Sequence, residues 1–296
     1  PRVVVGEDGG EELRDVMGPL FVDGGFGQDG QALTQAGRAK VLVKHALNGG
    51  AGARVVRLVS GDPFLYGCGP EEAQACLKAQ VGFEIVPGVS PVSAVPAYAG
   101  IPLTTAHHRE VAVVAANPKT NWSHYAEDRT LVLLGVGSTL PAIARALIEA
   151  GRDPLTPVSV TFTGTTTQQA TVTTTLDLVP ADLKGLCLDE RGVVVIGRVV
   201  DLRETLSWFE TKPLFGWRVL VPRTKEQSAV LCQRLRGFGS VPEEVPTISV
   251  EPPRNPLQMD KAVRGLVEGR YEWIAFTSIN AVKAVREKFE EYGLDA

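Results

Sequence analysis

Cysteine is scarce in this sequence, with four residues in 296. These are Cys68, Cys76, Cys187 and Cys232. They lie far apart, form no Cys-x-x-Cys pair and have no histidine at the spacing of a metal ligand. The spacing argues against both a zinc site and a disulfide framework, so we expect no bound metal and reduced thiols in a cytoplasmic protein.

Long apolar runs and basic clusters are also lacking. No segment approaches the ~20 apolar residues that a membrane-spanning helix requires, and no signal-peptide pattern opens the chain. Lysine and arginine are scattered, and the formal net charge is −4. We therefore expect a cytoplasmic enzyme with a small-molecule substrate and with neither a nucleic-acid nor a membrane partner.

The length and the 44% hydrophobic content are sufficient for at least two cores. The sequence starts without Met, directly in a strand-like run, and stops just after an amphipathic helical pattern. An alternating α/β protein would enter its next strand there, so we expect the chain to be a fragment.

Short β-branched runs alternate with helical patterns along the chain. The runs predict strands at residues 3–5, 55–59, 83–86, 111–115, 131–134, 158–162 and 193–196. The helical patterns cover residues 35–47, 71–79, 140–150 and 176–183. This alternation predicts an α/β fold with a largely parallel sheet. The threonine-rich residues 161–175 favour a hairpin, and therefore mixed pairing, over a low-complexity loop.

The pattern breaks at residues 208–216, WFETKPLFG, where Pro213 and Gly216 interrupt it. A new register follows, with strands expected at 217–221, 245–250 and 271–276, a helix at 227–235 and another after residue 279. We place a domain boundary at this break.

The loop SGDPFLYGCG after the second strand is the first candidate site. Its glycines let backbone approach a ligand, and the start of the next helix favours an anion. Glu71 and Glu72 at that helix start argue against a phosphate, whereas Asp62 before Pro63 is expected at the carboxyl edge of the sheet. An ordinary strand-to-helix turn is an equal alternative on these residues alone.

Three stretches together resemble the tetrapyrrole methylases, and most closely the uroporphyrinogen III C-methyltransferases. They are VSGDPFLYGCG, the segment VPGVSPVSAVPAYAGIPLT, and VIGRVV followed by LSWF. The resemblance implies a two-lobed α/β methylase fold over residues 1–207, with lobes of about 1–107 and 108–207, and a linker at 208–216. It also implies S-adenosyl-L-methionine bound between the lobes and a homodimer formed through this domain.

The resemblance assigns the cofactor contacts to eight positions. These are Ser60, Gly61, Asp62, Leu65, Ser90, Pro91, Gly135 and Gly164. The departures are specific. The family's GAGPGDP loop is absent, Glu7 is the remaining candidate base, residues 22–26 contain no lysine, and Ser60 and Cys68 replace a glycine and an arginine.

The alternative interpretation is a non-catalytic module that binds cofactor or product, or dimerises. A nucleotide-binding Rossmann enzyme ranks below both, because no GxGxxG follows a strand.

Residues 217–296 resemble the opening third of uroporphyrinogen III synthase, through WRVLVPR, EVPTI and WIAFTSINAV. That family cyclises hydroxymethylbilane with loss of water. The resemblance assigns substrate carboxylates to Arg223, Thr277, Ser278 and Asn280, although Ser278 and Asn280 could merely cap a helix. We thus expect a bifunctional enzyme of tetrapyrrole biosynthesis whose truncated two-lobed α/β synthase domain cannot catalyse alone. Whether it supplies haem, sirohaem or cobalamin stays open.

Overall fold

The computed structural model describes residues 2–7, 35–48, 54–115, 119–185, 192–222, 225–245 and 256–294. The chain divides into two compact units, Pro1–Gly216 and Trp217–Ala296. Residues 208–216, expected to be a linker, therefore fall within the first unit. None of the helices in the described part is long and apolar enough to cross a membrane.

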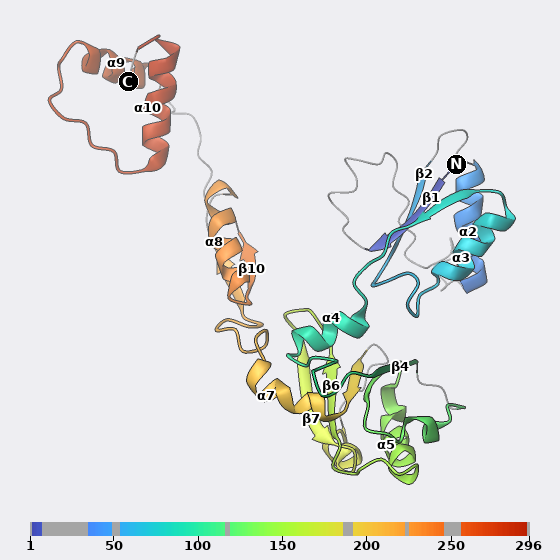
Figure 1. Cartoon of the computed structure of the whole chain (residues 1–296). Coiled ribbons are helices and arrows are strands. Elements are labelled where there is room, and N and C mark those ends of the chain that lie inside the picture. The colour runs from blue at the N-terminus through green and yellow to red at the C-terminus, as the bar shows by residue number, and fades with distance from the viewer. Residues whose placement is uncertain are drawn as a thin grey trace. The chain divides into compact units, whose positions relative to one another are not determined.

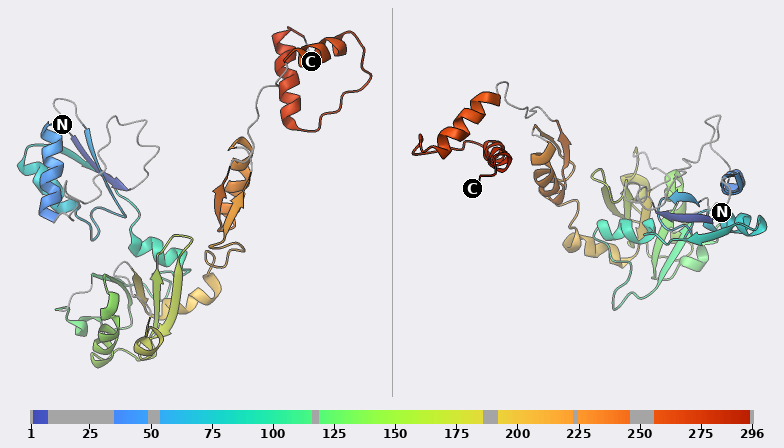
Figure 2. Two further views of the ribbon diagram at one scale, coloured as in Figure 1. Left: turned by 180° about the vertical axis from the view of Figure 1, so that it is seen from behind. Right: turned by 90° about the horizontal axis from the view of Figure 1, so that it is seen from above.

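Within the described ranges, the first sheet contains three parallel strands in the order β2-β1-β3. They are β1 (Arg2–Glu7), β2 (Arg54–Val59) and β3 (Gly82–Ile85). Helices α2 (Gln35–Asn48) and α3 (Gly69–Lys78) lie side by side next to the sheet (Figures 1 and 2). Their apolar residues form one core with the strands, in which Leu42, Ala46, Val55 and Cys76 are buried.

The second sheet has five strands in the order β4-β5-β8-β6-β7. They are β4 (Val111–Ala115), β5 (Thr130–Leu134), β6 (Pro157–Phe162), β7 (Ala170–Thr175) and β8 (Val193–Ile196). β4 and β5 are parallel, whereas β8 runs antiparallel to β5 and to β6, and β6 and β7 form an antiparallel pair. The hairpin and mixed pairing expected from the threonine-rich stretch are confirmed.

Both faces of the second sheet are covered. Leu131, Leu133 and the alternate residues of β8 pack against α5 (Leu140–Glu149) and α6 (Val179–Asp182). Val132 packs on the other face, in a cluster with α4 (Pro91–Tyr98) and η3 (Arg198–Leu202). Two buried faces explain why these strands read as continuous apolar runs. The cluster around Val132 also shows that α4 packs on the second sheet, although its sequence position assigned it to the first lobe.

Short elements complete the first unit. They are η1 (Trp122–Tyr125), η2 (Gly137–Thr139) and α7 (Arg203–Leu206). The helix expected at 176–183 shortens to α6, because the backbone over 176–178 forms a turn instead.

The second unit contains the parallel pair β9 (Arg218–Val221) and β10 (Val241–Glu244). Its helices are α8 (Lys225–Gly237), α9 (Pro256–Val267) and α10 (Ile279–Glu291). The strand expected at 271–276 was wrong, since this segment is irregular and Trp273 is 90% exposed. β10 ends at Glu244, and residues 246–250 of the strand expected at 245–250 lie outside the described part.

Candidate functional site

The loop that follows β2 packs directly against the start of α4. Gly61 is buried and has φ +77°, a backbone conformation that side chains disfavour. A Cβ atom at this position would lie 2.7 Å from Cδ of Pro91. The glycine is therefore required both by the backbone angle and by the close approach to α4.

Asp62 forms a tight turn at the carboxyl edge of the first sheet. Its Oδ1 accepts a hydrogen bond of 2.7 Å from the Phe64 backbone N–H, and its carbonyl accepts one of 3.3 Å from the Leu65 N–H. The Asp62 residue is half-buried, and Leu65 is 42% exposed. The same turn thus carries a half-buried aspartate and an exposed apolar side chain, which together suit a ligand with a cationic and an apolar part.

Tyr66 connects the same loop to the second sheet, which the sequence did not predict. Its hydroxyl donates a hydrogen bond of 2.6 Å to the backbone carbonyl of Val113 in β4. The backbone of Tyr66 is left-handed, with φ +57°. A strained backbone that persists beside a specific contact is typical of binding loops.

Ser90 and Pro91 begin α4. The buried Ser90 hydroxyl accepts a hydrogen bond of 3.2 Å from the Val92 N–H and so caps the helix. Pro91 occupies the first helical turn, where a missing N–H costs nothing, and its ring contacts the Gly61 loop. The structure brings Gly61, Ser90 and Pro91 together, with the Ser90 side chain engaged in capping.

Gly135 and Gly164 follow β5 and β6, which run in the same direction, so both lie at one edge of the second sheet. Gly135 has φ +66°, and a Cβ there would meet no atom within 4 Å. A Cβ on Gly164 would lie 2.5 Å from Cγ2 of Val95 in α4. Loops from both sheets therefore contact α4, while open space adjoins Gly135.

The structure describes only part of the predicted base and of the residues assigned to the synthase substrate. The Glu7 backbone ends β1 and pairs with Val59, next to the Ser60 loop; its side chain is outside the described part. Arg223 lies outside the described residues. Thr277 precedes α10, Asn280 is in its first turn, and Ser278 Oγ accepts a hydrogen bond of 3.2 Å from Ala281 N–H. Capping thus accounts for Ser278 but not for Asn280.

The site contains no candidate metal centre: across the described ranges, no three His, Cys, Asp or Glu side chains gather in a group that could hold an ion. What the arrangement offers is glycine backbone, small side chains and one carboxylate.

A model of the tetrapyrrole (corrin/porphyrin) methylases matches residues 2–180 of the chain. The chain belongs to the tetrapyrrole methylases. A second model, uroporphyrinogen-III synthase HemD, matches residues 229–296. This methylase therefore carries part of a HemD domain after its first unit.

Two curated relatives of this tetrapyrrole methylase extend across both units. The porphyrin biosynthesis protein HemD of Ruminiclostridium josui is 32% identical over 267 residues, covering 86% of this chain and 51% of the relative. The uroporphyrinogen-III C-methyltransferase of Bacillus subtilis is 34% identical over 254 residues, covering 82% and 50%. The chain thus spans about half the length of these relatives.

Solved structures support the fold of the methylase unit. A uroporphyrin-III C-methyltransferase from Thermus thermophilus matches with a TM-score of 0.53 and 27% identity, covering 69% of this chain and 98% of that one. A uroporphyrin-III C-methyltransferase from the same organism complexed with S-adenyl homocysteine matches with a TM-score of 0.51 and 25% identity, covering 68% and 87%.

Proposed function

We propose that the first unit binds S-adenosyl-L-methionine and methylates uroporphyrinogen III in the cytoplasm. The observation that carries the proposal is the meeting of two glycine loops at α4: Gly61 against Pro91, and Gly164 against Val95. The similar Thermus thermophilus enzyme complexed with S-adenyl homocysteine supports this choice of cofactor.

The residues present fit this cofactor. Open space at Gly135 leaves room beside the backbone for a flat group such as adenine. The half-buried Asp62 carboxylate can pair with the cationic amino group of the methionine part, because it keeps partial solvent access at the sheet edge.

When bound, S-adenosylmethionine supplies an electrophilic methyl group. The chain then has to orient the ligand and accept the proton that the methylated tetrapyrrole loses from a carbon next to the methylated ring, because the methylated carbon itself carries no hydrogen. Gly61 and Pro91 fix the loop that carries Asp62. Glu7 is the candidate proton acceptor, because the end of β1 lies beside Val59 at the edge from which this loop departs.

Isothermal titration of the chain with S-adenosylmethionine tests the binding, and incubation with uroporphyrinogen III tests the transfer. We expect saturable binding and a product heavier by one or more methyl groups. A chain that folds but gives no heat of binding would refute the proposal.

A second candidate is a non-catalytic module that holds cofactor or product, or dimerises. Its support is the absence of the family's lysine at Gly24 and the replacement of the family's glycine by Ser60 in the cofactor loop. Binding without turnover would favour this module. Recovery of methylation in a Gly24→Lys variant, which restores the family's lysine, would instead indicate impaired catalysis.

We further propose that the chain is a homodimer and that its second unit contributes to the cleft in which uroporphyrinogen III synthase cyclises hydroxymethylbilane. Thr277 and Asn280 at the start of α10 support a carboxylate contact, since backbone N–H groups at a helix start favour anions. Sedimentation equilibrium tests the dimer, and a mass equal to that of the monomer would exclude it.

A further inference from the structure

The segment after η3 returns to α4 and packs along it. The Trp208 indole Nε1–H donates a hydrogen bond of 3.0 Å to the Ala97 carbonyl. Tyr98 of α4 packs against the rings of Trp208 and Phe209, with centroids 5.2 Å and 4.7 Å away. A Cβ at Gly100 would lie 2.5 Å from the Leu206 carbonyl oxygen. These contacts fix the segment closely against the helix.

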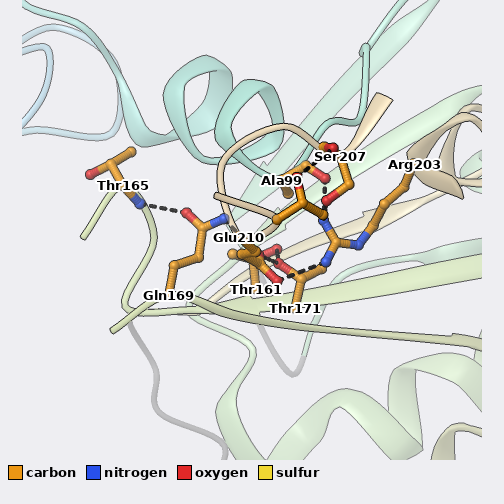
Figure 3. Close-up of polar contacts among 9 residues, drawn as sticks. Ala99, Thr161, Thr165, Gln169, Thr171, Arg203, Ser207 and Glu210 are labelled. Atoms are coloured by element: carbon orange, nitrogen blue, oxygen red, sulfur yellow. Dashed lines mark hydrogen bonds and ion pairs between the residues drawn. The ribbon is translucent and has the colours of Figure 1, made fainter. Parts of the chain in front are cut away.

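Glu210, in this segment, lies at the centre of a polar network (Figure 3). Its Oε2 pairs with Nη2 of Arg203 at 2.8 Å. Its Oε1 accepts hydrogen bonds from Gln169 Nε2 at 2.7 Å and from Thr171 Oγ1 at 2.6 Å. The side chains of Glu210 and Arg203 are only 16% and 15% exposed, so charge neutralisation and hydrogen bonding offset the cost of burying them.

Gln169 connects Glu210 to the loop between β6 and β7 by hydrogen bonds. The residue is 4% exposed, and its Oε1 accepts a hydrogen bond of 2.7 Å from the Thr165 backbone N–H. A carboxylate only accepts hydrogen bonds, so Glu210 can face only the amide nitrogen of Gln169. Glu210 thereby orients the Gln169 oxygen toward Thr165, as Figure 3 shows.

The loop needs such a restraint, because two of its threonines have unfavourable backbone angles. Thr163 has φ +44° and Thr165 has φ +67°, values that are uncommon for β-branched residues. Between them lies Gly164, whose position against Val95 allows no side chain. The geometry at Gly164 thus depends on a conformation that the local sequence does not favour.

We infer that Glu210, acting through Gln169, is a positioning residue that holds residues 163–165 in the conformation that contacts the adenosyl group. The inference rests on the proposed function, since it assigns Gly164 to cofactor binding. It adds a residue of the packed segment after η3, 41 positions from Gln169 in the sequence, to the determinants of cofactor affinity.

The test compares the chain with its Glu210→Ala, Gln169→Ala and doubly substituted variants. One readout is the dissociation constant for S-adenosylmethionine, and the other is hydrogen exchange of the Thr165 amide without cofactor. Each single change should weaken binding about tenfold and accelerate exchange at Thr165. The double change should weaken binding no further than Gln169→Ala, since contacts in one network are not additive.

Two controls separate positioning from folding. Glu204→Ala removes an exposed carboxylate on the neighbouring α7 and should leave affinity and exchange unchanged. The paired change Gln169→Glu with Glu210→Gln exchanges donor and acceptor while keeping an acceptor for Thr165. It should recover affinity to within about threefold of the original, whereas Gln169→Glu alone, which brings two carboxylates together, should not. Slow exchange at Val132 in β5 verifies that the sheet is intact.

The outcomes are distinct. Unchanged affinity in Glu210→Ala, in a chain that itself binds the cofactor, overturns the positioning role and leaves the proposed function standing. Failure of the unsubstituted chain to bind S-adenosylmethionine overturns both. Losses that add up in the double variant would show that Glu210 does not act through Gln169.

Discussion

At Gly61, two separate constraints disfavour a side chain. The left-handed φ of +77° costs other residues about 1–2 kcal/mol, and the Pro91 ring occupies the space that a Cβ needs. Gly151, at the end of α5, has the first constraint without the second: its φ is +102°, and a Cβ there would meet nothing within 4 Å. The two positions together separate backbone strain from steric overlap.

We predict that Gly61→Ala lowers the free energy of unfolding by about 3 kcal/mol, and Gly151→Ala by only about 1 kcal/mol. The difference arises from displacing Pro91. Affinity for S-adenosylmethionine should fall at least about tenfold in Gly61→Ala and stay unchanged in Gly151→Ala, as measured by urea unfolding and titration calorimetry. Equal effects of both substitutions would contradict a packing role for Gly61.

The loop motif predicted the location of Gly61 and Asp62, because a glycine and an acid before a proline have local conformational consequences. It could not predict the hydrogen bond from Tyr66 to Val113, whose partners are 47 residues apart. The same holds for Glu210, whose importance depends on Gln169 and Arg203 reaching it in the folded chain. Such contacts follow from tertiary packing rather than from any local pattern.

At the scale of elements, apolar runs in the sequence correctly predicted strands that are buried on both faces. They gave a wrong prediction for a segment that pairs with no strand in the described part. β5 and β8 were predicted from continuous apolar runs, and both lie within the five-stranded sheet. Residues 271–276, YEWIAF, are also rich in strand-forming residues, here mainly aromatic, but no strand pairs with them in the described part of the second unit. β-propensity reflects packing against neighbours, so an unpaired segment does not become a strand.

Helices α9 and α10 are joined by Lys288, whose Nζ lies 3.2 Å from Oδ1 of Asp260. Hydrogen bonding to Lys288, and then to Tyr292, lowers the pKa of Asp260 below its ordinary value of 3.8. A carboxyl group with a lowered pKa in the folded state stabilises that state above its unfolded pKa. This contribution is lost as the pH falls through the lower, folded-state pKa.

We therefore predict that Asp260→Asn lowers the thermal midpoint of the second unit near pH 7, and that the difference from the original chain shrinks as the pH falls below the ordinary aspartate pKa of 3.8. Circular dichroism melts at a series of pH values measure it. The control is Glu290→Gln, which breaks an exposed pair with Arg286 and should change the midpoint little at any pH. A difference that persists undiminished at pH 2 would exclude this ion pair as its source.

At the scale of the whole molecule, the two units differ in how completely they bury apolar residues. The first unit has two clusters around its second sheet and one beside its first. In the second unit, large apolar side chains remain open to solvent on several elements. They include Trp217, Leu257, Trp273 and Ile279, which are 66%, 68%, 90% and 67% exposed.

We predict that the 296-residue chain methylates added uroporphyrinogen III but does not cyclise hydroxymethylbilane. The reason is that the described part of the second unit has a sheet of two strands, and a sheet that small is marginally stable on its own. Chromatography of the oxidised porphyrin products measures both reactions in one preparation, so that methylation serves as the control for a folded chain. Formation of uroporphyrinogen III from hydroxymethylbilane would contradict this reading of the second unit.

The packing of α4 on the second sheet also sets an order of events during synthesis. The helix ends at Tyr98, but its partners in β8 begin at Val193, about 95 residues later. At a translation rate of about 5–20 residues per second, β8 is synthesised roughly 5–20 seconds after α4, and until then the apolar face of α4 cannot pack against β8. During that interval α4 is not fixed against β8, so the ribosome must finish the second sheet before the loop that carries Gly61 can assume its final form.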